Sequence, residues 1–152
     1  GAVAPLVKAG AAAVIVDGPN LAAEVRQATG AKMRLALDAV AGETFGRLAE
    51  TLEDGGMLVN YGAMSMQSAQ VAAGSMIFCN ITIKGFWLVN RFAKVSKEDR
   101  MKTYGALTQA VAQSALHAPI DQVFTLDQIT EAVTYTMAGK RADKVLLAPN
   151  GI

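Results

Sequence analysis

Short, almost wholly apolar runs alternate with amphipathic segments through the first half of the chain, and this alternation constrains the fold most. Four runs have the length and composition of buried strands, at residues 12–16, 35–40, 57–61 and 81–84. Each is followed by turn residues and then by a segment with helical periodicity. Near-continuous apolar strands separated by single helices are typical of a parallel sheet that is covered on both faces. The pattern therefore predicts an α/β fold with four strand–helix steps.

Three helices are expected between these strands. The first covers residues 21–28, with Asn20 as its N-cap and Gly30 at its end. The second begins at Glu43 or Thr44 and is stopped by Gly55-Gly56; its apolar stripe has the spacing i, i+3, i+4, i+7 and consists of Phe45, Leu48, Ala49 and Leu52. The third covers roughly residues 69–78.

The second half of the chain has a different pattern of predicted helices and strands. Ser96 with Asp99 predicts the start of a long helix over residues 97 to about 116. Its predicted apolar side contains Met101, Tyr104, Leu107, Val111 and Leu116. A strand at 121–124 follows, then a capping box of Thr125 and Gln128 that opens a helix to about Met137, with Gly139 just beyond it. Residues 144–147 form the last predicted strand.

Composition and charge exclude several classes of protein. The 152 residues carry a formal net charge of +1, which removes the electrostatic reason to expect nucleic acid or an anionic membrane surface. The longest apolar runs, such as residues 9–16, are too short to span a bilayer. A single cysteine, Cys79, excludes an internal disulfide framework and a cysteine-rich zinc site. Together with the absence of a readable signal peptide, it leads us to expect a cytoplasmic protein.

Three of the predicted strands end in unusual residues. The segments concerned are Asp38-Ala39-Val40-Ala41-Gly42, Tyr61-Gly62-Ala63-Met64-Ser65 and Gly85-Phe86-Trp87-Leu88, the last with the only tryptophan. Ligands of open parallel sheets bind outside the carboxyl ends of the strands, and small residues there let a ligand approach the backbone. The three segments are therefore expected to line one crevice. The alternative is that the glycines are ordinary turn residues and that Phe86-Trp87 belongs to the core.

At these residues the chain resembles the medium-chain dehydrogenase/reductase superfamily. The order Leu37-Asp38-Ala39-Val40-Ala41-Gly42-Glu43, Gly55-Gly56 to Ser65, and Ile81 to Leu88 carries the resemblance, as does the closing Lys144-Val145-Leu146-Leu147. The Tyr-Gly-x-Met and Gly-Phe-Trp-Leu pair is most similar to the NADPH-dependent 2-enoyl thioester reductases. The resemblance extends over nearly the whole chain.

The resemblance implies a fold and a domain organisation. The chain would be the carboxyl-terminal part of a longer reductase, whose amino-terminal part is absent here. Residues 1–115 would be the second part of a Rossmann-type doubly wound parallel sheet. Residues 116–152 would be the return into a GroES-like catalytic domain.

The resemblance also implies the residues that contact the cofactor. NADPH is expected, with NADH as an alternative, and backbone groups at two strand ends would grip the nicotinamide carboxamide. The implied contacts are Tyr61, Gly62, Ala63, Met64, Phe86, Trp87, Leu88, Val40 and Lys144. Ala41 and Ala63 depart from the family pattern, in which glycine is usual at both positions.

Other features of the family are not in this chain. No glycine-rich G-x-G-x-x-G segment follows an amino-terminal strand, and the tyrosine that enoyl reductases use as proton donor lies in the domain that is missing. We therefore assign no catalytic residue and no metal ligand, and we expect no zinc. Cys79 and His117 are interpreted as structural, because one cysteine and one histidine cannot supply a zinc ligand set.

Two further groups of residues have alternative interpretations. Asp38 is either a general base or, as we favour, an acceptor for nearby backbone N–H groups. The basic stretch that contains Arg91, Lys94, Lys97, Arg100 and Lys102 is interpreted as a solvated helix face, with substrate phosphates as the alternative.

The sequence thus predicts part of an NADPH-dependent reductase that transfers hydride to an activated double bond, either a 2-enoyl thioester or, as the alternative, a quinone. A catalytically inactive nucleotide-binding or dimerisation module is the rival from another class. The resemblance implies a homodimer built through edge strands of the Rossmann sheet, with residues 81–84 as the candidate edge. Because such a piece leaves apolar faces uncovered, an extensive apolar partner surface is also expected.

Overall fold

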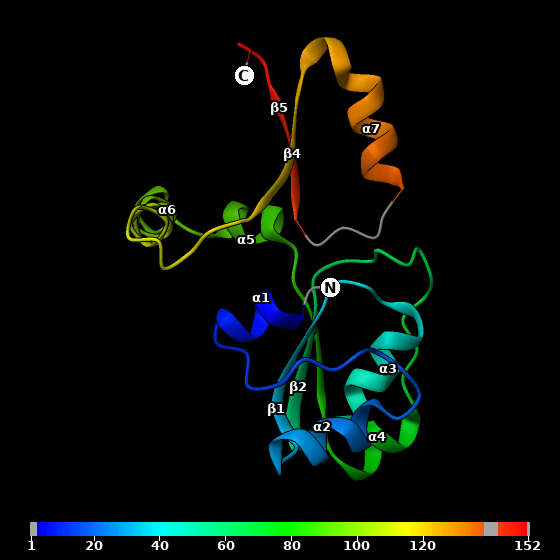
Figure 1. The fold of residues 1–152 in the computed structure, drawn as a ribbon. Helices are drawn as coiled ribbons and strands as arrows, with labels where there is room; N and C mark the ends of the chain where they lie inside the picture. The colour runs from blue at the N-terminus through cyan, green and yellow to red at the C-terminus, as the bar shows by residue number, and fades with distance from the viewer. Residues whose placement is uncertain (1–2, 139–142, 152) are drawn as a thin grey trace. The chain divides into compact units, whose positions relative to one another are not determined.

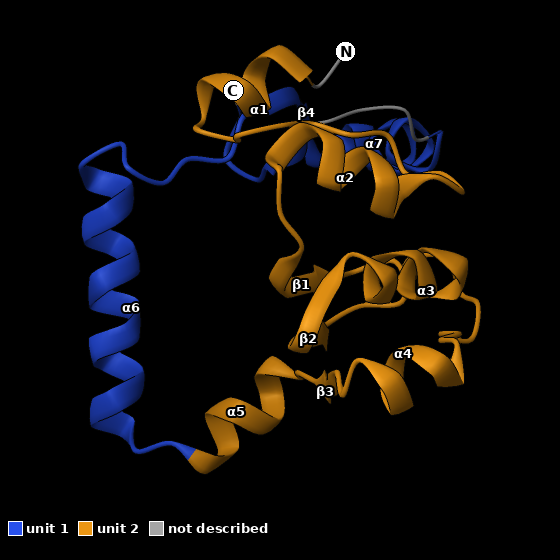
Figure 2. Cartoon of the chain, turned by 90° about the horizontal axis from the view of Figure 1, so that it is seen from below, with its two compact units in different colours: residues 1–2, 95–152 blue, residues 3–94 orange. Residues whose placement is uncertain are grey.

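The computed structural model describes residues 3–138 and 143–151. These residues fall into two compact units, one formed by residues 3–94 and the other beginning at residue 95 (Figure 2). Each unit contains its own parallel sheet. Mixed helices and parallel strands are as predicted for an α/β chain.

The first unit contains a three-stranded parallel sheet in the order β1-β2-β3, of which β1 and β2 are labelled in Figure 1 and all three in Figure 2. The strands are β1 (Met33–Asp38), β2 (Leu52–Asn60) and β3 (Thr82–Gly85). The helices of this unit are α1 (Val3–Lys8), α2 (Leu21–Thr29), α3 (Gly42–Glu50), α4 (Ala73–Phe78) and α5 (Leu88–Lys94). The register pairs Asp38 with Asn60 and Asn60 with Gly85, so the three strands end in one row.

The core of this unit lies between the sheet and α3. The predicted stripe of α3 is confirmed for Phe45, Leu48 and Ala49, because Phe45 and Ala49 are buried and Leu48 packs against the core cluster that contains them. Opposite them lie Ala36 of β1, Leu58 of β2 and Ile81. On the other face of β1, Leu35 and Leu37 are exposed, so within the described residues only one face of this strand is covered.

Helix α2 begins and ends where the sequence predicts. It starts directly after Asn20, and Gly30 closes it in the left-handed conformation with φ 72°, donating its N–H to the Arg26 carbonyl. Asn20 occupies the predicted N-cap position, but in the described structure its side chain makes no capping hydrogen bond.

The predicted strand at residues 12–16 is wrong. Residues 11–17 are described and form neither strand nor helix, and Val16 is 83% exposed. A strand requires a neighbour with which to exchange backbone hydrogen bonds. In the described sheet β1 pairs with β2, and no strand lies beside residues 12–16.

The predicted stop at Gly55-Gly56 is also wrong. Helix α3 already ends at Glu50, with Thr51 as its C-cap, and both glycines lie within β2. Leu52 accordingly begins the strand instead of continuing the helical stripe, and it is buried in the core. The β1–β2 register shifts between Met33 and Leu35, and Gly55 supplies the positive φ of 75° within the shifted part of β2.

The second unit contains two parallel strands, β4 (Ile120–Thr125) and β5 (Lys144–Ala148), with the long helix α6 (Lys97–Ala112), the short 3-10 helix η1 (Leu126–Gln128) and α7 (Ile129–Met137). Ser96 caps α6 by accepting the Asp99 N–H at 3.0 Å, as predicted. The capping box of Thr125 and Gln128 is present, but it opens η1, which continues into α7. Gly139 lies outside the described residues.

Several predicted helix limits are too generous. Helix α4 starts at Ala73 instead of residue 69, and α6 ends at Ala112 instead of residue 116. Helix α5 was not predicted. The predicted apolar side of α6 is exposed in the described chain, including Met101, Leu107 and Val111.

Candidate functional site

An open cleft lies at the carboxyl ends of β2 and β3, within the first unit. It has a volume of about 840 Å³. The residues that line it are Asn60, Tyr61, Gly62, Ala63, Lys84, Gly85, Phe86, Trp87, Asn90, Arg91 and Lys94. The cleft is therefore where the rule for open parallel sheets expects a ligand.

Five of the residues that the sequence singled out meet in this cleft: Tyr61, Gly62, Ala63, Phe86 and Trp87. The other four do not line it. Met64 and Leu88 are exposed beside it, Val40 lies in the loop after β1, and Lys144 begins β5 in the other unit. The role of all nine as cofactor contacts stays a prediction.

Aromatic rings and cations share the walls of the cleft. Tyr61, Phe86 and Trp87 are all substantially exposed, and Trp87 is 64% exposed. Lys84, Arg91 and Lys94 make no ion pair within the described part of the chain. None of the described residues that line this cleft is acidic. It can therefore hold a ligand that combines a flat ring with negative charge.

Gly85 leaves its side of the cleft open. A Cβ built on Gly85 would have no heavy atom within 4 Å beyond its chain neighbours. The backbone at the end of β3 is thus accessible from the cleft, and a ligand can approach it without meeting a side chain.

Gly62, unlike Gly85, is tightly packed against a neighbouring loop. A Cβ at this position would lie 2.7 Å from the Ala39 carbonyl oxygen and 3.2 Å from the Ala39 Cα. The loop after β2 therefore packs directly on the loop after β1. Backbone hydrogen bonds join the same two loops: the Met64 N–H donates to the Ala39 carbonyl at 3.0 Å, and the Ser65 N–H donates to the Val40 carbonyl at 2.9 Å.

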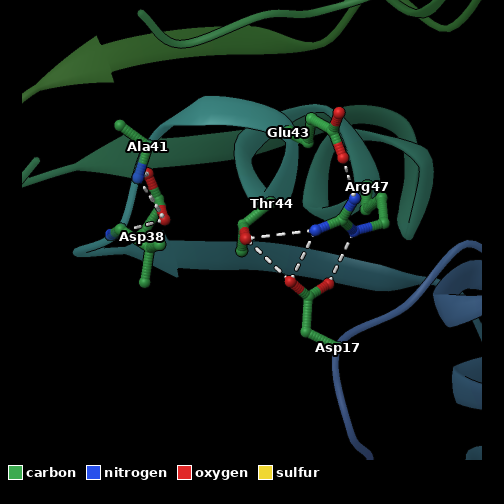
Figure 3. Close-up of polar contacts among 7 residues, drawn as sticks. Asp17, Asp38, Ala41, Glu43, Thr44 and Arg47 are labelled. Carbon is green, nitrogen blue, oxygen red and sulfur yellow. Dashed lines mark hydrogen bonds and ion pairs between the residues drawn. The ribbon is translucent and has the colours of Figure 1, made fainter. Parts of the chain in front are cut away.

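Asp38 lies behind this wall and is 1% exposed. Its carboxylate accepts hydrogen bonds from the N–H groups of Val40 and Ala41 at 2.9 Å and 3.0 Å (Figure 3). The interpretation of Asp38 as an acceptor for nearby backbone groups is thereby confirmed. A third donor, the Asn60 side-chain amide at 2.7 Å, comes from the neighbouring strand.

A second polar cluster holds the segment before α2. Arg47 donates from Nε and Nη2 to the two carboxylate oxygens of Asp17, both at 2.7 Å, and Thr44 donates to Asp17 at 2.7 Å (Figure 3). Glu43 accepts from Arg47 Nη1 at 3.0 Å. The hydrogen bonds from Arg47 and Thr44 lower the pKa of Asp17 to about 2, and those from Asp17 and Glu43 raise the pKa of Arg47. The cluster is structural, because its donors and acceptors satisfy one another.

The described residues offer no metal site. No three histidine, cysteine, aspartate or glutamate side chains lie close enough together to hold an ion in that part of the chain. A zinc ligand set therefore does not fit the residues described, and the expectation of a zinc-free protein stays a prediction. Nor does the described chain contain a helix that is both long and apolar enough to cross a bilayer.

Comparison with known proteins identifies the class. Residues 9–147 match the model of the zinc-binding dehydrogenase family, and the chain belongs to that family, within the medium-chain dehydrogenase/reductase superfamily. The resemblance seen in the sequence is thereby confirmed.

Two curated relatives illustrate the range of the family. The mitochondrial enoyl-[acyl-carrier-protein] reductase of Yarrowia lipolytica is 33% identical over 104 residues, which cover 68% of this chain and 27% of the relative. The NADPH quinone oxidoreductase of Kluyveromyces marxianus is 31% identical over 97 residues, which cover 64% of this chain and 25% of the relative. The chain thus spans about a quarter of the length of these relatives.

Solved structures share the fold. A complex described as Etr1p with NADP and crotonyl-CoA superposes with a TM-score of 0.62 at 25% identity and covers 80% of this chain and 35% of its own. The mitochondrial 2-enoyl thioester reductase Etr1p/Etr2p heterodimer from Candida tropicalis has a TM-score of 0.64 at 23% identity, with 80% and 35% of the two chains covered. The α/β fold with parallel sheets, of the kind found in reductases of this superfamily, is thus shown.

Sequence reasoning missed part of the cleft. The sequence patterns do not indicate Asn60, Lys84 or Asn90, and for Arg91 and Lys94 they favour a solvated helix face, whereas all five line the cleft. Asn60 and Lys84 directly precede the two segments that were singled out, and that adjacency is the signal by which they could have been found.

Proposed function

We propose that this chain forms the nicotinamide side of the cofactor cleft in an NADPH-dependent reductase of activated double bonds. The observation that carries the proposal is the meeting of Tyr61-Gly62-Ala63 with Gly85-Phe86-Trp87 around one cleft at the carboxyl ends of β2 and β3. The names of the relatives, an enoyl reductase and an NADPH quinone oxidoreductase, support the same class of reaction.

The residues of the cleft fit a dinucleotide. The open backbone at Gly85 leaves room for a flat ring, and Tyr61, Phe86 and Trp87 supply apolar walls. Asn60 and Asn90 carry amide groups that can pair with a carboxamide, while Lys84, Arg91 and Lys94 favour negatively charged groups. Met64, Leu88, Val40 and Lys144 are proposed as further contacts of the longer protein.

The chemistry that NADPH supplies when bound is hydride donation to the β-carbon of the double bond. The residues of this chain hold and orient the ring and exclude one side of it from solvent. No catalytic residue is proposed within the chain.

We propose a 2-enoyl thioester as the substrate class, because the Phe86-Trp87-Leu88 segment favours the enoyl reductase branch. A quinone is the second candidate, since the quinone oxidoreductase relative is similar at nearly the same identity. An inactive nucleotide-binding or dimerisation module remains the non-catalytic alternative.

The domain organisation is part of the proposal. Residues 1–115 are proposed to belong to a Rossmann domain whose first half lies outside this chain, and residues 116–152 to the return into a catalytic domain. A glycine-rich fingerprint encoded upstream of Gly1 would support this assignment, and its absence would contradict it. We also propose a homodimer through β3, which is an edge strand of the described sheet. A cytoplasmic location and NADPH in preference to NADH complete the proposal.

Trp87 provides a direct test of the cofactor site. It is the only tryptophan of the chain and lines the cleft, so its fluorescence reports on that place alone. On titration with NADPH we expect energy transfer from Trp87 to the reduced nicotinamide, with weak affinity because only half of the site is present. Submicromolar affinity would contradict this account of what the chain lacks.

The substrate class is tested on the longer protein. Activity with crotonyl-CoA and NADPH is expected, and a preference for quinones would favour the second candidate. A protein that is inactive on both but still binds NADPH through Trp87 would support the non-catalytic alternative.

A further inference from the structure

The carboxylate of Asp38 joins the ends of two neighbouring strands. It accepts the N–H of Val40 and the N–H of Ala41, which belong to the loop after β1. Its oxygen Oδ2 also accepts from the Asn60 side-chain amide at 2.7 Å, and Asn60 is its register partner at the end of β2. One buried side chain thus holds three donors, two from the loop after β1 and one from the end of β2.

Asn60 extends this connection to the wall of the cleft. Its amide nitrogen donates a second hydrogen bond to the Gly62 carbonyl at 2.9 Å. The Tyr61 N–H donates to the Asp38 carbonyl at 2.8 Å, and the Phe86 N–H donates to the Asn60 carbonyl at 2.8 Å. The backbone that lines the cleft on both strands is therefore bonded to the pair formed by Asp38 and Asn60.

The loop after β1 holds a strained residue beside this pair. Ala41 has φ 65° and ψ −154°, a conformation that is essentially restricted to glycine. Ala41 is buried, and both oxygens of Asp38 accept its N–H. An unfavourable conformation persists only where its surroundings fix it, and Asp38 is the side chain that does so here.

We propose that Asp38 is a positioning residue of the cofactor cleft, which sets the affinity for the dinucleotide by fixing the loops 38–41 and 60–64. The inference rests on the proposed function and adds to it a residue that does not line the cleft. The carboxylate of Asp38 acts through Asn60, which lines the cleft and whose side-chain amide also binds the Gly62 carbonyl.

The substitution Asp38→Asn breaks this connection at a defined point. Its single side-chain oxygen can still accept the N–H groups of Val40 and Ala41, but its amide group would then face the amide group of Asn60. Two donors would oppose each other where a donor and an acceptor now meet, and a buried donor without a partner is costly. Combining it with Ala41→Gly removes the strain at position 41 and thereby preserves folding.

The experiment compares four chains: the unmutated protein, Ala41→Gly, Ala41→Gly with Asp38→Asn, and Asp17→Asn as matched control. Asp17→Asn also removes a hydrogen-bonded carboxylate, but it lies outside the cleft. Energy transfer from Trp87 measures NADPH affinity, thermal unfolding measures stability, and amide hydrogen exchange by NMR measures the order of Tyr61 and Met64.

Asp38→Asn in the Ala41→Gly chain is expected to lower NADPH affinity by about tenfold and to accelerate exchange at the Tyr61 and Met64 amides. Asp17→Asn should leave both unchanged even where it lowers the melting temperature. Unchanged affinity in a folded Asp38→Asn chain would overturn the inference, and so would an equal loss of affinity in Asp17→Asn. Failure of the unmutated chain to bind NADPH would instead overturn the proposed function.

Discussion

Arg47 binds Asp17 through two nitrogen–oxygen pairs of 2.7 Å each, across 30 residues of sequence. The parallel arrangement of two N–H donors against two carboxylate oxygens is the strongest geometry that this pair of side chains can adopt. It fastens the irregular segment before α2 to α3. Side chains therefore hold in place a segment for which the sequence predicts a strand.

Replacing Asp17 should destabilise the first unit. Asp17→Asn removes the negative charge and converts one of the two oxygens that together accept three hydrogen bonds into an amide donor. We expect a loss of about 1 kcal/mol in the free energy of unfolding, measured by urea denaturation. Glu43→Gln is the matched control, because Glu43 accepts a single bond from Arg47 and its side chain is 77% exposed. Equal losses in the two variants would contradict the importance given to the Asp17 pair.

The same pair predicts a dependence of stability on pH. The pKa of Asp17 is lowered from 3.8 to about 2, chiefly by the hydrogen bond from Arg47. A lowered folded-state pKa means that the contribution is complete above about pH 4 and is lost as the pH falls toward 2. Since Asp17 is 39% exposed, solvent screening limits the loss to about 1 kcal/mol or less.

Urea unfolding at pH 5, 3 and 2 measures this effect. The difference in unfolding free energy between the unmutated chain and Asp17→Asn should be largest at pH 5 and should shrink toward pH 2. A difference that stays constant over this range would show that Asp17 does not titrate as its contacts require.

Ala41→Gly should stabilise the protein. The φ of 65° and ψ of −154° at Ala41 cost an alanine about 1–3 kcal/mol, more than the extra freedom that glycine gains in the unfolded chain. We expect a net gain of about 1 kcal/mol and a higher melting temperature. Ala63→Gly is the matched control, because the family pattern also has glycine there but Ala63 has no positive φ. That variant should be neutral or slightly destabilised; a gain at both positions would point away from strain as the cause.

Gly62→Ala should separate the two strand-end loops. The added Cβ would lie 2.7 Å from the Ala39 carbonyl oxygen, so backbone must move, and we expect a loss of about 2 kcal/mol. Gly85→Ala, in open space, should cost well under 1 kcal/mol in stability but should hinder NADPH at the cleft. Chemical denaturation and the fluorescence of Trp87 distinguish the two effects. Similar stability losses in both variants would contradict the close packing at Gly62.

The cations of the cleft should contribute to nucleotide binding. Arg91→Gln with Lys94→Gln removes two of the three positive charges that line it, and we expect NADPH affinity to fall about tenfold at low salt and less at high salt. Lys32→Gln removes an exposed charge that does not line the cleft and is the control. An equal fall in the control, or no fall in the double variant, would refute this role.

The predictable part of the fold is the part that one face of the core determines. Phe45 and Ala49 recur at helical spacing, and Leu58 lies in a short apolar run typical of a buried strand. Burial against one another explains both patterns, so α3 and the sheet can be predicted from them. Residues 12–16 have the same apolar character, but a strand forms only beside a neighbouring strand. The local sequence does not show whether such a neighbour is present. The prediction that Gly55-Gly56 ends a helix is wrong for a related reason. Glycine is common both at the ends of helices and at register shifts in strands, and the position of the partner strand determines which of the two structures forms.

The site divides in the same way. Glycines and aromatic residues after strands mark a place that a ligand can approach, so Tyr61, Gly62, Phe86 and Trp87 could be identified from the sequence. Asn60 and Lys84 belong to the strands themselves, so their residue type does not mark them, and only their position directly before the segments 61–65 and 85–88 indicates a place in the site. The strain at Ala41 is not predicted from its own residue type, and the glycine that the family usually has at this position is the signal by which it could have been found.

The hydrogen bonds that continue from β1 and β2 into their loops have a thermodynamic consequence. Because Met64 and Ser65 are already bonded to Ala39 and Val40, the wall of the cleft is ordered before any ligand arrives. Binding of a ligand therefore does not have to order a flexible loop, so little of the binding enthalpy is cancelled by a loss of conformational entropy. The side chains of Asp38 and Asn60 are bonded directly to each other. Among related sequences we therefore expect a substitution at position 38 to be accompanied by a compensating substitution at position 60.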